Sequence, residues 1–167
     1  YQKAYFLNNP QKDPKNSAAL ALNLGNIYFL LGNFSKALMY YDKRLAAAFP
    51  FDHAETEILF YRRLGASAFQ LRDPAQTASA YLNALELIQK RIAPQKASEI
   101  LGKLNTQIFD RIITPALSKP ELAQTANSLG EKQAAIHQEL FKATGAATGQ
   151  IHSLPDPAWP AYRKAIE

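Results

Sequence analysis

The sequence predicts an all-α protein made of successive antiparallel helix pairs. Three observations support this prediction. Apolar residues recur at helical spacing along most of the chain, turn-forming residues interrupt the apolar stretches, and a set of residues repeats at an offset of forty. With 167 residues, 47% of them hydrophobic, the chain is long enough to bury a core.

The first predicted helix pair covers residues 13–50, with helices near 14–31 and 34–48. Gly32 suits the left-handed residue that follows a helix, and Asn33 can cap the next helix with its side-chain oxygen. The apolar stripes that define the two helices are Leu20, Leu24, Ile27 and Leu31, and then Phe34, Leu38, Tyr41 and Leu45.

The second predicted pair covers residues 52–92, with helices near 53–71 and 74–92. Asp52 and Glu55 have the spacing of a capping box at the start of the first helix. Asp73 followed by Pro74 predicts a cap and a first turn for the second helix.

The two pairs align with one another at the offset of forty. Because a residue without Cβ permits close approach, we expect Gly25 and Gly65 at equivalent places where the two helices of each pair meet. The aligned positions are Leu24-Gly25 with Leu64-Gly65, Phe29 with Phe69, Leu31 with Leu71, Asn33 with Asp73, and Tyr1 with Tyr41 and Tyr81.

These residues resemble a tetratricopeptide repeat. The first copy has Leu24, Gly25, Tyr28, Ala37, Tyr41 and Pro50, and the second has Tyr61, Leu64, Gly65, Tyr81 and Ala84. The resemblance implies a tetratricopeptide-like superhelix of antiparallel helix pairs, an α-α solenoid. Such repeats have about 34 residues, so the offset here implies about six more per unit. Departures from the pattern are Ala21, Thr77, and Arg44 where a small residue is usual.

The remaining segments complete a predicted repeat domain over residues 1–143. Residues 1–12 resemble the tail of an upstream repeat, and residues 94–143 form a divergent helical pair from helices near 95–113 and 118–143, with Ser118 and Glu121 as a capping box. Residues 144–157 are predicted to be a linker and 158–167 a C-terminal helix. The helices at both ends would leave apolar faces uncovered unless something docks there.

The resemblance implies that the first helix of each pair lines a concave groove that binds a peptide or helix of another protein. We therefore expect a protein-interaction scaffold or adaptor, with a structural or oligomerisation module of a larger assembly, including self-association, as the alternative. Arg62 and Arg63 are predicted to bind the partner because Arg can pair bidentately with carboxylates. The competing interpretation is that these two arginines form intramolecular salt bridges. The predicted partner-binding residues are Asn23, Asn26, Phe29, Arg62, Arg63 and Phe69.

No motif for catalysis, metal binding or a cofactor occurs in the sequence, so we predict no enzyme. Cysteine is absent, and His53, His137 and His152 lie far apart without metal-ligand spacing. The net charge of +5 is concentrated in the first fifty residues, but no Lys/Arg cluster interleaved with aromatics predicts nucleic-acid binding. No apolar run reaches the length that spans a bilayer, and the compartment stays open.

Overall fold

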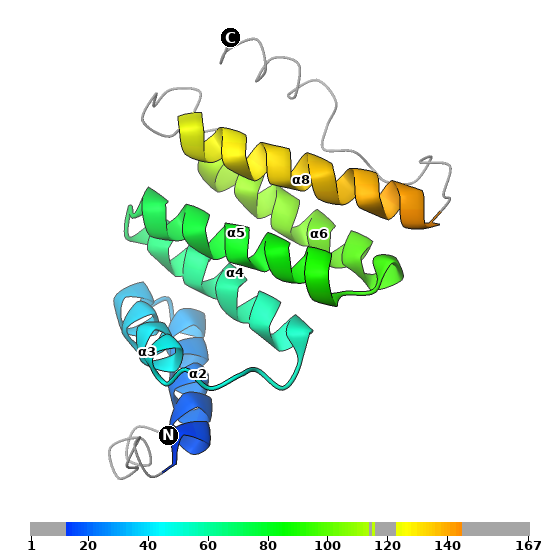
Figure 1. Cartoon of the computed structure of the whole chain (residues 1–167). Helices are drawn as coiled ribbons and strands as arrows, with labels where there is room; N and C mark the ends of the chain where they lie inside the picture. Colours follow the sequence, from blue (N-terminus) through cyan, green and yellow to red (C-terminus); the bar gives the residue numbers. More distant parts are fainter. Residues whose placement is uncertain (1–12, 114, 116–122, 145–167) are drawn as a thin grey trace. The chain divides into compact units, whose positions relative to one another are not determined.

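The computed structural model describes residues 13–113, 115 and 123–144, and within these ranges the chain is helical and contains no strand (Figure 1). It divides into two compact units, Tyr1–Ala80 and Tyr81–Glu167, which are described separately below. The predicted upstream tail 1–12, the Ser118–Glu121 capping box, the linker beyond residue 144 and the C-terminal helix 158–167 lie outside the described residues.

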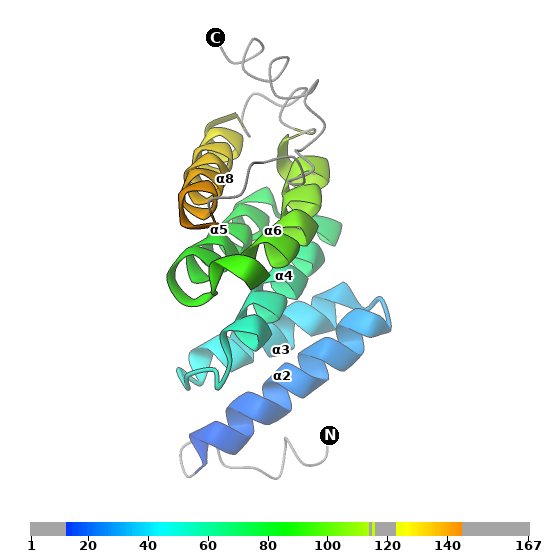
Figure 2. The ribbon, with the colours of Figure 1, turned by 90° about the vertical axis from the view of Figure 1, so that its right-hand side faces the viewer.

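The first unit contains helices α2 (Pro14–Leu30), α3 (Phe34–Ala46) and α4 (Ala54–Gln70), and the first turns of α5 (Pro74–Arg91). Helices α2 and α3 run antiparallel and side by side, joined by a short turn (Figure 2). All four helices begin and end within two residues of the predicted bounds, so this part of the all-α prediction is confirmed.

The turns that end α2 and α4 have the same hydrogen bonds at positions forty residues apart. The amide of Asn33 donates to the carbonyl oxygen of Tyr28 at 2.9 Å, and the amide of Asp73 donates to that of Ala68 at 3.0 Å. The residue before each donor is left-handed, with φ of 71° at Gly32 and 61° at Arg72. This combination is the Schellman motif that commonly ends a helix.

Side-chain caps begin the helices where the sequence predicted them, with one exception. Asn33 accepts from the amide of Lys36 at 3.2 Å, and Asp73 accepts from that of Gln76 at 2.9 Å. The predicted cap at Asp52 is wrong, because the N-cap of α4 is His53, which is extended and makes no side-chain capping bond. Phe51 packs on the ring of Phe60 with centroids 5.2 Å apart, and this tertiary contact fixes where the chain enters α4.

The core of the first unit is built around Tyr41, whose side chain is fully buried. Its ring meets that of Phe60 edge to face, with centroids 5.3 Å apart. A hydrophobic cluster around this pair comprises Ala37, Tyr41, Phe60, Leu64 and Ala80. Helices α2 and α3 approach closely here because Gly25 lies against the Tyr41 ring.

The second unit contains the rest of α5, α6 (Pro94–Ile108), the π-helical segment η1 (Phe109–Ile113) and α8 (Ala123–Thr144). Helices α6 and α8 lie side by side (Figure 1). The predicted helix 95–113 is therefore correct in extent, but its last five residues adopt the wider π form. The fully buried large side chains of this unit are Tyr81, Leu85, Ile88, Leu101, Leu104, Ile108, Ile112 and Leu129.

Candidate functional site

The predicted partner-binding residues all lie in the first unit, on two helices that contact each other. Helix α2 carries Asn23, Asn26 and Phe29, and α4 carries Arg62, Arg63 and Phe69. Each of these helices buries a strip of small residues, including Ala21 and Gly25 on α2, against the core. The predicted residues stand beside these strips and are half-buried or exposed.

Asn26 is engaged within the protein. Its side-chain Oδ1 accepts a hydrogen bond from the hydroxyl of Tyr41 at 3.1 Å. Burial raises the pKa of Tyr41, and the positive charge of Arg63 opposes this shift. The phenol therefore stays protonated and keeps donating to Asn26, which means that Asn26 helps to join α2 to α3.

Phe29 and Arg63 lie together at this surface. The guanidinium carbon of Arg63 is 5.7 Å from the ring centroid of Phe29, within the range of a cation–π interaction. Phe29 also meets Phe34 edge to face, with centroids 5.9 Å apart. Among the described residues, no hydrogen bond or ion pair holds the Arg63 guanidinium, so its N–H groups have no acceptor there.

The structure thus brings together Asn26, Phe29 and Arg63, and adds Tyr41 and Phe34 to them. Asn23 is exposed on α2, whereas Arg62 and Phe69 are half-buried and have partners of their own within the protein. Phe34 was missed as a site residue because its place in the apolar stripe of α3 indicates core. Only its position directly after the Asn33 cap, where the helix starts at the surface, could have indicated otherwise.

The described part of the chain contains neither a cluster of metal-binding side chains nor a membrane-spanning helix. Residues 13–113 and 123–144 hold no group of three or more His, Cys, Asp or Glu side chains that could bind a metal ion. Over the same residues, no helix combines the length and apolar character needed to cross a membrane.

Comparisons of this chain with protein-family models, curated proteins and solved structures find no match.

Proposed function

We propose that this chain is a protein-interaction scaffold of tetratricopeptide-like helix pairs, in which the surface formed by α2 and α4 binds an extended or helical segment of another protein. The observation that carries the proposal is the Arg63 guanidinium. It stands over Phe29, next to the Asn26–Tyr41 pair, with no acceptor among the described residues.

The arrangement of the first unit supports a repeat architecture. Helix α4 contacts both α3 and α2, as the first helix of a following repeat does in a stack of antiparallel pairs. The Schellman turns at Gly32 and Arg72, and the caps at Asn33 and Asp73, recur at the offset of forty. Equal turns at equal spacing support a sequence repeat of about forty residues.

The chemistry of the surface suits a segment that presents acidic side chains or free backbone carbonyl oxygens beside an apolar side chain. A guanidinium offers a planar set of N–H donors, and its position over an aromatic ring holds that plane in place. Phe29 is half-buried, so part of its ring can receive an apolar side chain of the partner. A cation, an aromatic ring and an amide on neighbouring helices thus offer both affinity and orientation.

Site-specific photocrosslinking in the full chain tests the proposal. A photoreactive amino acid in place of the exposed Asn23 should capture the partner, whereas the same amino acid in place of the exposed Gln138 on α8 should not. Adding Arg62→Ala and Arg63→Ala should abolish capture from position 23. The double variant Lys90→Ala and Lys103→Ala, which removes two exposed cations from the second unit, is the charge-matched control.

The proposal fails if the double arginine variant captures partners as well as the wild type does. It also fails if positions 23 and 138 capture the same proteins with the same yield. Circular dichroism of each variant shows whether the helices are retained, so loss of capture can be separated from loss of fold.

A structural or self-associating role is the second candidate, and exposed leucines favour it. Leu30 and Leu31 at the end of α2 are each 73% exposed, and Leu71 at the matching turn is 46% exposed. If these leucines pack in an assembly, Leu30→Lys with Leu31→Lys should lower the mass measured by light scattering at high concentration. A wild-type chain that stays monomeric at that concentration would exclude this role for the patch.

A further inference from the structure

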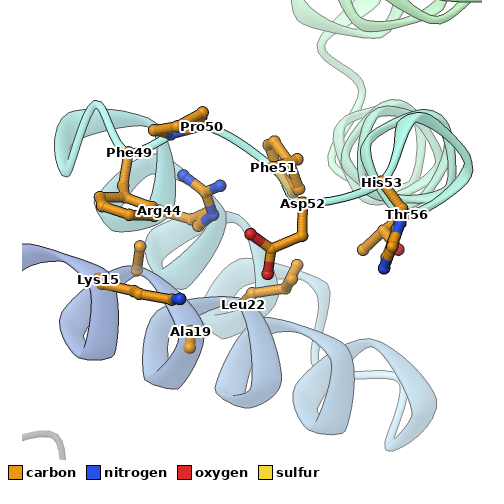
Figure 3. A pocket seen from close by; sticks show the side chains of 11 residues that line it. Lys15, Ala19, Leu22, Arg44, Phe49, Pro50, Phe51, Asp52, His53 and Thr56 are labelled. Atoms are coloured by element: carbon orange, nitrogen blue, oxygen red, sulfur yellow. The ribbon is translucent and has the colours of Figure 1, made fainter.

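A hollow in the first unit lies between the start of α2, the connection from α3 to α4, and the start of α4. Its volume is about 140 Å³. Figure 3 shows that the Arg44, Asp52 and Lys15 side chains extend into it. Leu22, Phe49 and Phe51 contribute apolar walls, so the hollow combines charged groups with an apolar lining.

Arg44 is the unusual member of this pocket. The residue is only 4% exposed, and its guanidinium carbon lies 3.8 Å from the centroid of the Phe51 ring. Within the described residues, the guanidinium makes no hydrogen bond and no ion pair. A guanidinium has five N–H donors, and no Arg44 nitrogen is among the fully buried side-chain atoms that lack a partner, so these donors face the hollow. An acceptor that enters the pocket would satisfy them.

The charges around Arg44 do not replace such an acceptor. Burial lowers the pKa of Arg44, while Glu57 first, then Tyr61 and Asp52, oppose this shift through their charges. Neither carboxylate forms an ion pair with the guanidinium in the described part of the chain. The negative groups thus favour the charged form of Arg44 from a distance and leave its donors open.

The start of α4 brings helix amide groups to the same pocket, and its first turn also carries the carboxylates of Glu55 and Glu57. His53 and Thr56 line the hollow, and they belong to the cap and the first turn of this helix of 17 residues. The side chains of Asp13, Asn33 and Asp73 cap the other three helix starts of this unit. His53 makes no such bond. The N-terminal end of a helix carries partial positive charge and unpaired amide groups, which favour a bound anion.

We propose that this pocket binds a carboxylate carried on a small apolar group. The carboxylate would pair with the guanidinium of Arg44, whose plane Phe51 holds from one side, while the apolar body would rest on Leu22 and Phe49. The volume is below the roughly 300 Å³ of sites for drug-sized ligands, which limits the ligand to a small acid or one peptide residue. Asp52 and the apolar walls disfavour a phosphate dianion.

The pocket shares no residue with the group of Asn26, Phe29 and Arg63, so this inference does not depend on the proposed scaffold function. Its test is an NMR titration of the full chain with sodium butyrate and sodium benzoate at constant ionic strength. Signals of the Arg44 Nε–H group and of the Thr56 amide should shift and saturate. Butyramide and benzamide should bind at least about tenfold more weakly, because a neutral amide loses the charge-assisted pair.

Three variants locate the site. Arg44→Met should abolish the titration, while Lys36→Met, which removes one positive charge outside the pocket, should leave it unchanged. Ala19→Phe should also abolish it, because Ala19 is an exposed lining residue whose enlargement fills the hollow without changing any charge. Asp52→Asn should tighten binding, because it removes the competing carboxylate.

Peptides distinguish a free acid from a chain terminus. Two peptides of one sequence, ending in Leu as a free carboxylate or as an amide, are compared with butyrate. Tighter binding of the free carboxylate peptide identifies a protein C-terminus, and equal affinity for butyrate and that peptide identifies a small free acid. Binding of the amides as strong as that of the acids, or unchanged butyrate binding by both Arg44→Met and Ala19→Phe, overturns the proposal. Whichever result is obtained, Arg62→Ala with Arg63→Ala should leave the titration unaffected, because neither arginine lines the pocket. The outcome is therefore independent of whether the surface of α2 and α4 binds a partner.

Discussion

Gly25 of α2 lies directly against the ring of Tyr41 of α3. A Cβ on Gly25 would stand 2.5 Å from both Cδ1 and Cε1 of that ring, closer than carbon atoms normally approach. Glycine inside a helix costs about 0.5–1 kcal/mol relative to alanine, so its presence here is explained by the contact that it permits. The sequence prediction that Gly25 lies where its two helices meet is confirmed.

Replacing Gly25 with Leu should lower the free energy of unfolding by about 1–3 kcal/mol, the usual range for overpacking. Thermal or urea unfolding followed by circular dichroism measures the loss. Gly102→Ala on α6 is the control, because no atom of the described residues lies within 4 Å of a Cβ at that position. This control should gain up to about 1 kcal/mol from helix propensity. Equal effects of the two variants would show that the contact with Tyr41 does not decide the residue at position 25.

The matching turns at Gly32 and Arg72 predict that introducing glycine at position 72 raises the free energy of unfolding, whereas removing glycine at position 32 lowers it. Both residues have positive φ, which costs about 1–2 kcal/mol for a residue with a Cβ. Arg72→Gly should therefore raise the free energy of unfolding by roughly 0.5–1 kcal/mol, and Gly32→Ala should lower it by a similar amount. Denaturant midpoints measure both. A loss of stability in Arg72→Gly would mean that the arginine side chain has a stabilising contact larger than the backbone strain.

Tyr41 predicts a fall in stability at alkaline pH. Its folded pKa is raised above the ordinary value of 10.0, so the phenol ionises in the unfolded state first. This contribution is fully present below pH 10 and is lost as the pH rises toward the folded value, by at most about 1.4 kcal/mol per pH unit. Tyr41→Phe should reduce the difference in unfolding free energy between pH 9 and pH 11. At pH 7 it should cost about 0.5–1.5 kcal/mol through the lost bond to Asn26. An unchanged alkaline slope would contradict this assignment.

Local signals in the sequence were sufficient for the helices and most of their ends. Asn33 and Asp73 cap helices as predicted because capping depends on residues three positions away. The predicted cap at Asp52 failed because the packing of Phe51 on Phe60 is a tertiary contact, which a local pattern cannot contain. The π-helical form of residues 109–113 could not be predicted either, because the apolar spacing of these residues does not differ from that of α6.

The hydrogen-bond partners that side chains find on other helices could not be predicted from the sequence. Tyr41 and Tyr81 are both fully buried, as their alignment suggested, but their hydroxyls differ in partner. Tyr41 donates to Asn26, whereas the hydroxyl of Tyr81 accepts from Nη1 of Arg111 at 2.7 Å. The residue forty positions after Asn26 is Ala66, which has no polar side chain, so the second copy cannot repeat that bond. Arg44 was recognised only as a departure from the repeat, and what covers it depends on the path of residues 49–52.

A buried amide pair in the second unit predicts a site that does not tolerate charge. Nε2 of Gln133 on α8 donates to Oδ1 of Asn105 on α6 at 2.6 Å, and Oε1 of Gln133 has no partner within the described residues. Gln133→Glu replaces the donor with a carboxylate oxygen and places a buried negative charge beside an acceptor. We expect a loss of roughly 3–5 kcal/mol at pH 7, the range for an uncompensated buried charge. Gln138→Glu, at an exposed position of the same helix, should change stability by less than about 0.5 kcal/mol. Similar effects of the two variants would contradict the burial of Gln133.

Arg44 predicts that stability and ligand binding separate. If the guanidinium is kept for a ligand, then in the free protein its charge is largely removed from water and has no hydrogen-bond partner among the described residues, which costs free energy. Arg44→Met keeps most of the aliphatic volume against Phe51 and removes the charge, so its free energy of unfolding should equal or exceed that of the wild type. Arg44→Ala removes the packing as well and should be less stable than Arg44→Met by about 2–5 kcal/mol, the range for shortening a buried methionine. Urea unfolding of the three proteins without added carboxylate measures this order. A loss of several kcal/mol in Arg44→Met, abolished when Asp52→Asn is combined with it, would instead show that Arg44 and Asp52 stabilise each other in solution. The guanidinium would then have an internal partner, and the pocket would have no open donors to offer a carboxylate.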